Sequence, residues 1–162
     1  VWNYHAQLTA THPYGSPWWS WPILKHPVLF HLDTSVTPAR RISATGNPVL
    51  WWVGFATVWL TLLSLLIPRF RSRETTDRLV ESWLLLGVLG FWLPWALIQR
   101  VAFHYHYFLS FTLTVVLLAL WLARWLEHPA RRLAAIGFLL AAIVGFVYLY
   151  PSAAALPAVW LR

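Results

Sequence analysis

The chain has 162 residues, of which 59% are hydrophobic and only 10% are charged, and its mean hydropathy is +0.59. Soluble domains carry about 25% charged residues, so the composition excludes an ordinary soluble domain and indicates a membrane protein. The net charge of +7 does not indicate nucleic-acid binding, because the basic residues cluster between apolar runs, where they orient a chain in the membrane.

The first residues are polar and rich in Trp, and we find neither an initiating Met nor the charged and apolar regions of a signal peptide. We therefore expect the chain to be the C-terminal piece of a longer polytopic protein. With no Cys, it can form no disulfide, thiolate metal site or cysteine nucleophile.

The segment from Tyr4 to Pro22 contains three Trp, three Pro and two His within 19 residues. Indole rings favour the headgroup level of a bilayer, and proline stiffens the backbone. We expect residues 1–48 to form an outward-facing interfacial segment without a separate domain. Its indoles, those of Trp18, Trp19 and Trp21, are predicted to line a groove for a lipid tail or a sugar. Most other tryptophans lie near ends of predicted spans, as in an aromatic belt.

Four apolar runs are long enough, or nearly so, to cross a bilayer as helices, which takes about 20 residues. The runs are Val49–Ile67, Ser82–Gln99, Tyr107–Ala123 and Leu133–Tyr150. Asn47 can cap the first helix and Pro48 suits its first turn, while Pro94 is expected to kink the second. The predicted fold is an all-α membrane protein with four transmembrane helices in residues 49–150 and a tail at 151–162.

The last run repeats a small residue every four positions, at Gly137, Ala141 and Gly145. Such a stripe lets another helix approach closely. No ionisable residue falls inside any of the four predicted runs, which disfavours a transporter or channel, because such residues mark ion and proton paths.

Two short loops, between the first two runs and between the last two, hold seven basic residues. These are Arg69, Arg71, Arg73, Arg78, Arg124, Arg131 and Arg132. The positive-inside rule places both loops in the cytoplasm. The interfacial segment, the turn at 99–106 and the tail at 151–162 are then predicted to face outward.

The outward turn begins at Arg100 and holds two imidazoles and two phenols at the mouth of two helices. A guanidinium can donate two parallel hydrogen bonds to the oxygens of a phosphate. An arginine at a membrane boundary can equally extend its charged end to the lipid headgroups. The orientation favours the phosphate interpretation, because it puts Arg100 on the face of the interfacial segment. The residues expected at this phosphate site are Arg100, His106, Tyr105, His12, Tyr14 and His5.

The pair His104 and His106 is open to three interpretations: metal ligands, structural histidines or contacts to a ligand. No Cys exists and no acid lies near this turn, so we expect no metal site and no cofactor. Acid–base chemistry needs a carboxylate or a tuned histidine near the acceptor. Asp33 is a lone acid in a run typical of a turn, so we assign no catalytic residue to this chain.

Three blocks of the sequence resemble motifs of the protein O-mannosyltransferase family, in the family's order. They are His12-Pro13-Tyr14-x-Ser16-x-Trp18-Trp19-x-Trp21-Pro22, Gly46-Asn47-Pro48-Val49-Leu50-Trp51-Trp52, and Leu93-Pro94-Trp95 followed by Arg100-x-x-Phe103-x-Tyr105-His106-Tyr107. The sequence departs from the family at His26, which precedes Pro27 where the family has Arg, and after Tyr107, where the family has a nearby Pro. The family's acidic catalytic motif belongs to a first outward loop that this chain lacks.

The resemblance implies a fragment of a large, multi-spanning glycosyltransferase whose active site faces away from the cytoplasm. It implies a C-terminal membrane module that helps to transfer mannose from a polyprenyl (dolichyl) phosphate to Ser or Thr of a secreted acceptor protein. The expected partners are that donor, the acceptor, the lipid bilayer and the N-terminal remainder of the enzyme. We expect a bacterial plasma membrane, or the endoplasmic reticulum in a eukaryote, and an inactive fragment. A non-catalytic membrane scaffold is the alternative.

Overall fold

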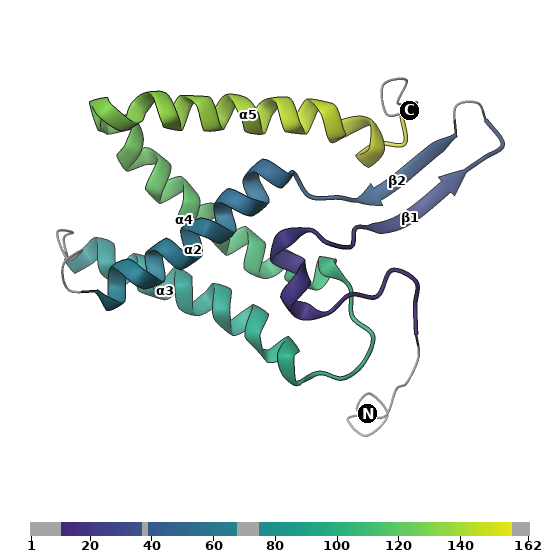
Figure 1. The fold of residues 1–162 in the computed structure, drawn as a ribbon, viewed down its shortest axis with the longest axis horizontal. Helices are drawn as coiled ribbons and strands as arrows, with labels where there is room; N and C mark the ends of the chain where they lie inside the picture. Colours follow the sequence, from purple (N-terminus) through teal and green to yellow (C-terminus); the bar gives the residue numbers. More distant parts are fainter. Residues whose placement is uncertain (1–10, 37–38, 68–74, 157–162) are drawn as a thin grey trace.

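The computed structural model describes residues 11–36, 39–67 and 75–156, and these are mostly helical (Figure 1). The elements are, in chain order, η1 (Trp18–Ile23), β1 (Val28–Asp33), β2 (Arg40–Ala44), α2 (Pro48–Leu66), α3 (Thr75–Trp92), η3 (Leu93–Leu97), η4 (His104–Tyr107), α4 (Phe108–Glu127) and α5 (Pro129–Ala153). Four helices of the described chain are long and apolar enough to cross a membrane, which confirms the predicted fold class.

The four long helices lie beside one another, and the short elements gather at one end of them (Figure 1). At that end a core cluster consists of Trp21, Trp51, Trp92 and Tyr107. A second, aliphatic cluster joins α2, α3 and α4 further along the helices; its members are Val58, Leu85, Val88 and Leu117. The interfacial segment is therefore packed into the same structure as the spans.

The start of α2 has the predicted cap at Asn47 and the predicted proline in its first turn. Asn47 caps the helix, since its Oδ1 accepts hydrogen bonds from the N–H groups of Val49 at 3.0 Å and Leu50 at 3.4 Å. Pro48 occupies the first turn, where a missing N–H costs nothing. In the second span the α-helix α3 ends at Trp92, and the 3₁₀ helix η3 follows it directly. Pro94, the residue expected to kink the second helix, lies within η3.

Helix α3 begins at Thr75, several residues before the apolar run predicted from Ser82. The helix is therefore longer at its N-terminal end than the apolar run indicates. The added turns bring Glu81 into the span, where it is fully buried. Arg124 of α4 donates from Nη1 to Glu81 Oε1, and its Nη2 lies 3.1 Å from Asp77 Oδ2. An ionised carboxylate is costly to bury unless a cation pairs with it. This ion cluster ties α3 to α4 at the end opposite the short elements.

Residues 28–44 contain an antiparallel β-hairpin that the sequence analysis did not predict. An isolated two-stranded hairpin is only marginally stable in water, so it needs support from other elements. Val28 is buried, and β2 lies against α5. Asp33 ends β1 in a turn, where its Oδ1 accepts from the Ser35 hydroxyl at 2.6 Å and the Ser35 N–H at 2.9 Å. These hydrogen bonds lower the pKa of Asp33 and give it a structural role.

The small-residue stripe of α5 meets the cap of α2 at Gly145. Asn47 Nδ2 donates to the carbonyl of Ala142 at 2.8 Å. A Cβ at Gly145 would lie 3.0 Å from Asn47 Oδ1 and 3.1 Å from its Nδ2, whereas one at Gly137 would meet nothing within 4 Å. Gly145 thus makes room for the side chain that both caps α2 and holds α5.

We predict that Gly145→Ala destabilises the protein relative to Gly137→Ala, although both remove a helical glycine. Alanine in a helix interior gains about 1 kcal/mol over glycine at either site. At Gly145 the new methyl displaces Asn47, which is already committed to the cap and to Ala142, and cap loss alone costs about 1 kcal/mol. Thermal unfolding in detergent measures the difference. Equal melting temperatures for the two variants would contradict the contact.

Candidate functional site

The N-terminal strip, residues 11–24, is held on the helix ends by indole N–H groups. Trp51 of α2 donates to the carbonyl of Trp21 at 2.9 Å, and Trp92 of α3 donates to the carbonyl of Trp18 at 3.0 Å. A third indole, that of Trp52, donates to the carbonyl of Ile23 at 3.2 Å. Trp51 and Trp92 are buried, so these two tryptophans serve as anchors for the strip and not as an aromatic belt.

Trp21 fills the space beneath the strip. Its ring is fully buried, and its Nε1 lies 2.9 Å from Ser16 Oγ and 3.2 Å from the Ser16 carbonyl oxygen. This corrects the expectation that Trp21 lines a groove for lipid or sugar, because it has no exposed surface to offer. Trp19 is half exposed, with Lys25 Nζ 5.1 Å from its ring centroid.

The strip packs against the loop at residues 98–103, which joins η3 to η4. The N–H of Ser16 donates to the carbonyl of Ala102 at 2.8 Å, and the rings of His12 and Phe103 meet edge to face with centroids 5.1 Å apart. Gly15 allows this approach, since a Cβ there would lie only 2.7 Å from Val101 Cγ2. The strip and the loop thus form the two walls of one site.

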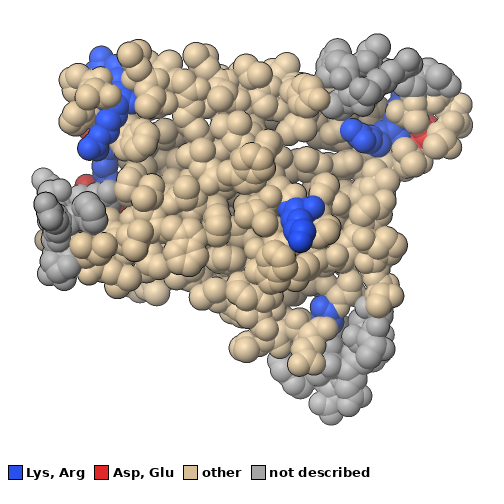
Figure 2. All heavy atoms as spheres, in the orientation of Figure 1, with Lys and Arg blue, Asp and Glu red and all other residues tan. Residues whose placement is uncertain are grey.

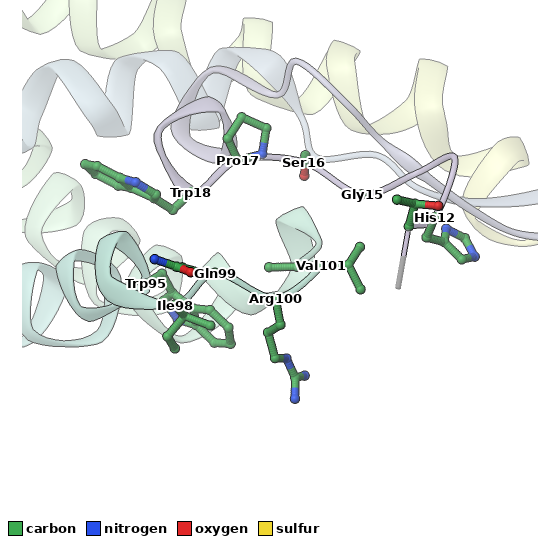
Figure 3. A pocket seen from close by; sticks show the side chains of 12 residues that line it. His12, Gly15, Ser16, Pro17, Trp18, Trp95, Ile98, Gln99, Arg100 and Val101 are labelled. Carbon is green, nitrogen blue, oxygen red and sulfur yellow. The ribbon is translucent and has the colours of Figure 1, made fainter. Parts of the chain in front are cut away.

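An open pocket of about 520 Å³ lies between these walls (Figure 3). Ligand pockets are commonly about 300–1,000 Å³, so this one has room for a phosphate and a sugar ring. Its lining residues are Thr11, His12, Gly15, Ser16, Pro17, Trp18, Trp95, Ile98, Gln99, Arg100, Val101 and Ala102.

The chemistry of the lining suits an anion attached to an apolar or sugar group. Arg100 supplies the guanidinium among the described lining residues, and in Figure 3 its side chain extends away from the strip. His12 and Gln99 add polar groups, while Trp18 and Trp95 present indole surface. No acidic side chain is among the described lining residues, so no carboxylate there repels a phosphate.

Tyr105 and His106 form an aromatic stack behind the pocket instead of lining it. The His106 ring centroid is 4.7 Å from that of Tyr105 and 4.3 Å from that of Trp95. His106 Nδ1 also lies 3.1 Å from the backbone N of Phe103 and 2.9 Å from its carbonyl O. The stack therefore fixes two parts of the wall, Trp95 and Phe103, and places Tyr105 and His106 in a supporting position.

The structure thus brings together three of the predicted site residues, His12, Trp18 and Arg100. Tyr14 is adjacent, because its N–H donates to His12 Nδ1 at 3.2 Å. His5 lies outside the described residues. Sequence reasoning missed Trp95 and Gln99 as lining residues, although Trp95 belongs to a block already noted and Gln99 precedes Arg100.

The two histidines of the H-x-H pair occupy different environments. His104 is buried, and its ring contacts the rings of Trp51 and Phe108 with centroids 6.2 and 5.5 Å away. His106 belongs to the aromatic stack. The described residues contain no group of three metal-ligating side chains, and the two rings serve different clusters.

Comparisons with known proteins all point to one family. Residues 1–159 match the family model described as the C-terminal four TMM region of protein-O-mannosyltransferase. A polyprenol-phosphate-mannose–protein mannosyltransferase of Mycolicibacterium smegmatis is 24% identical over 97% of this chain and 33% of that relative. Protein O-mannosyl-transferase 1 of Mus musculus is 32% identical over 74% of this chain and 17% of that relative.

A solved structure shares the fold. It is the S. cerevisiae protein O-mannosyltransferase Pmt1-Pmt2 complex bound to the sugar donor, and it matches 99% of this chain with a TM-score of 0.79 at 20% identity. The match covers 25% of that yeast chain. This chain therefore spans about a third or less of the length of the relatives it matches.

Proposed function

This chain belongs to the protein O-mannosyltransferase family, and from that premise we propose that it is the C-terminal membrane module of a mannosyltransferase. The whole enzyme transfers mannose from polyprenyl-phosphate mannose to Ser or Thr hydroxyls of a secreted acceptor protein. The names of the bacterial relatives support both the donor and the protein acceptor. The chain is a multi-pass membrane protein, in keeping with its four helices.

The observation that carries this proposal is the guanidinium of Arg100 among the residues that line the pocket. Breaking the bond between mannose and phosphate leaves negative charge on the phosphate. A guanidinium placed beside that charge stabilises it in the transition state more than in the ground state, and this lowers the barrier. We assign this phosphate contact to Arg100, with His12 on the opposite wall as a hydrogen-bonding partner for the ligand.

The apolar part of the donor needs a different surface. Trp18 and Trp95 offer indole faces within the pocket, which suit a sugar ring or the first isoprene unit. No carboxylate is among the described residues that line the pocket, so we assign the base that deprotonates the acceptor hydroxyl to another part of the longer enzyme. The isolated module is accordingly expected to transfer no mannose.

We further propose that the pocket faces away from the cytoplasm. The described arginines of the predicted cytoplasmic loops lie at the far end of the helices from the pocket, around the starts of α3 and α5 (Figure 2). The positive-inside rule puts that end in the cytoplasm. Relatives in Mycolicibacterium and Corynebacterium favour a bacterial plasma membrane.

Replacing Arg100 by Lys in the full-length enzyme tests the phosphate contact. Lysine keeps the charge but loses the bidentate geometry. Hydrogen bonds to charged groups are worth about 1.5–3 kcal/mol each, so we expect activity to fall on the order of tenfold to a hundredfold. Arg131→Lys, exposed at the opposite end, is the matched control and should retain activity. Wild-type activity and donor affinity in folded Arg100→Lys would reduce Arg100 to an interfacial anchor.

Single cysteines test the orientation, since the chain has no native Cys. A Cys at Thr34, exposed beyond β1, should react with an impermeant thiol reagent added outside intact cells. A Cys at Ala130, exposed at the start of α5, should react only after the membrane is permeabilised. Labelling of the Ala130 position from outside would reverse the orientation and move the pocket to the cytoplasmic face.

A further inference from the structure

The free edge of the hairpin is a structural feature that the pocket does not explain. Within the described residues β1 pairs with β2 alone, and β2 lies between β1 and α5 (Figure 1). The outer edge of β1 therefore presents backbone N–H and C=O groups without strand partners there. An exposed edge of this kind can accept an extended peptide as an additional strand.

This edge borders the candidate site. The Phe30 ring centroid is 6.1 Å from that of Tyr105, which belongs to the aromatic stack behind the pocket. The register of the hairpin shifts between Leu29 and His31, so Phe30 is a bulged residue. Bulges redirect a side chain, and here Phe30 remains 59% exposed beside the stack. A peptide on the edge would therefore pass close to the pocket wall.

The side chains around the edge indicate what kind of peptide fits. Phe30 and Leu32 are both more than half exposed and offer apolar contacts. The basic side chains His31, Arg40 and Arg41 also belong to the hairpin, whereas its one acid, Asp33, is engaged by Ser35. A lysine-rich segment is thus disfavoured, and an uncharged or acidic extended segment is favoured.

We propose, on the basis of the function proposed above, that the acceptor polypeptide binds as an added strand on the free edge of β1. Its backbone pairs with β1, and its Ser or Thr is delivered beside the pocket that holds the donor. Because main-chain hydrogen bonds carry little sequence information, such an edge accepts many sequences as long as they are extended. The enzyme then selects unfolded or loop segments by conformation.

Backbone-methylated acceptor peptides test this proposal with the full-length enzyme. In a strand, alternate N–H groups point to opposite edges, so two peptide series carry N-methyl groups on the odd or on the even positions around the target Ser. One series removes the hydrogen bonds to β1, and the other leaves them intact. At about 1 kcal/mol for each of two bonds, KM for the first series should rise on the order of tenfold or more, with little change in kcat.

A photoreactive residue next to the target Ser locates the bound peptide. Cross-links should fall within residues 28–33, and Phe30→Ala should lower their yield while leaving the melting temperature of the enzyme unchanged. Equal KM values for the two methylated series, or cross-links only outside β1, would overturn the edge-strand proposal. Absence of mannose transfer to the unmodified peptide would instead overturn the proposed function, so the two failures are distinguishable.

Discussion

The structure depends on indole N–H groups that donate to backbone carbonyls of the N-terminal strip. Trp51 and Trp92 make these bonds from within the bundle, to Trp21 and Trp18 respectively. The 3₁₀ turn lies against apolar helices and needs donors that fit among apolar side chains. The Trp21 carbonyl accepts the indole N–H in addition to the Leu24 N–H at 3.1 Å, and one such hydrogen bond contributes about 0.5–1.5 kcal/mol. Tryptophan meets this need uniquely well, since it provides both a large apolar surface and a single donor.

The pocket follows from that anchoring. With the strip held in place, the Ser16 N–H reaches the carbonyl of Ala102 in the loop after η3, and Gly15 leaves room for the Val101 side chain. The loop is in turn supported by His106 and its aromatic neighbours. Arg100 is thus carried by a wall whose position is set from both sides. The ion cluster of Glu81 and Arg124 fixes the pairing of α3 and α4 at the other end.

Much of the fold was predictable because its signals are local. Apolar run length gave the four spans, and Asn47 with Pro48 gave the start of the first. Other features depend on tertiary contacts that no local pattern encodes. An indole at a helix end looks the same in sequence whether it faces lipid or donates to the strip, and Trp51 and Trp92 do the latter. The hairpin was missed because its support comes from the distant helix α5.

The site was predictable only where its residues stand out in the local sequence. Arg100 and His12 stood out as polar groups in aromatic surroundings, and both line the pocket. Tyr105 and His106 stood out equally, but stacking with Trp95 turns them to a supporting role. Trp21 was assigned to a groove because it neighbours Trp18 and Trp19, yet the 3₁₀ turn directs its ring inward.

Hydrogen exchange at the strip tests the central claim most directly. Trp51→Phe and Trp92→Phe keep aromatic rings but remove the donors to the strip, while Trp83→Phe changes a side chain that is 72% exposed. We expect the Ser16 and Leu24 amides to exchange faster in Trp51→Phe and Trp92→Phe, by about five- to thirtyfold if each lost hydrogen bond stabilises the strip by about 1–2 kcal/mol. In Trp83→Phe the exchange rates of these amides should not change. Unchanged protection of these amides in Trp51→Phe and Trp92→Phe would contradict the anchoring role of the two indoles.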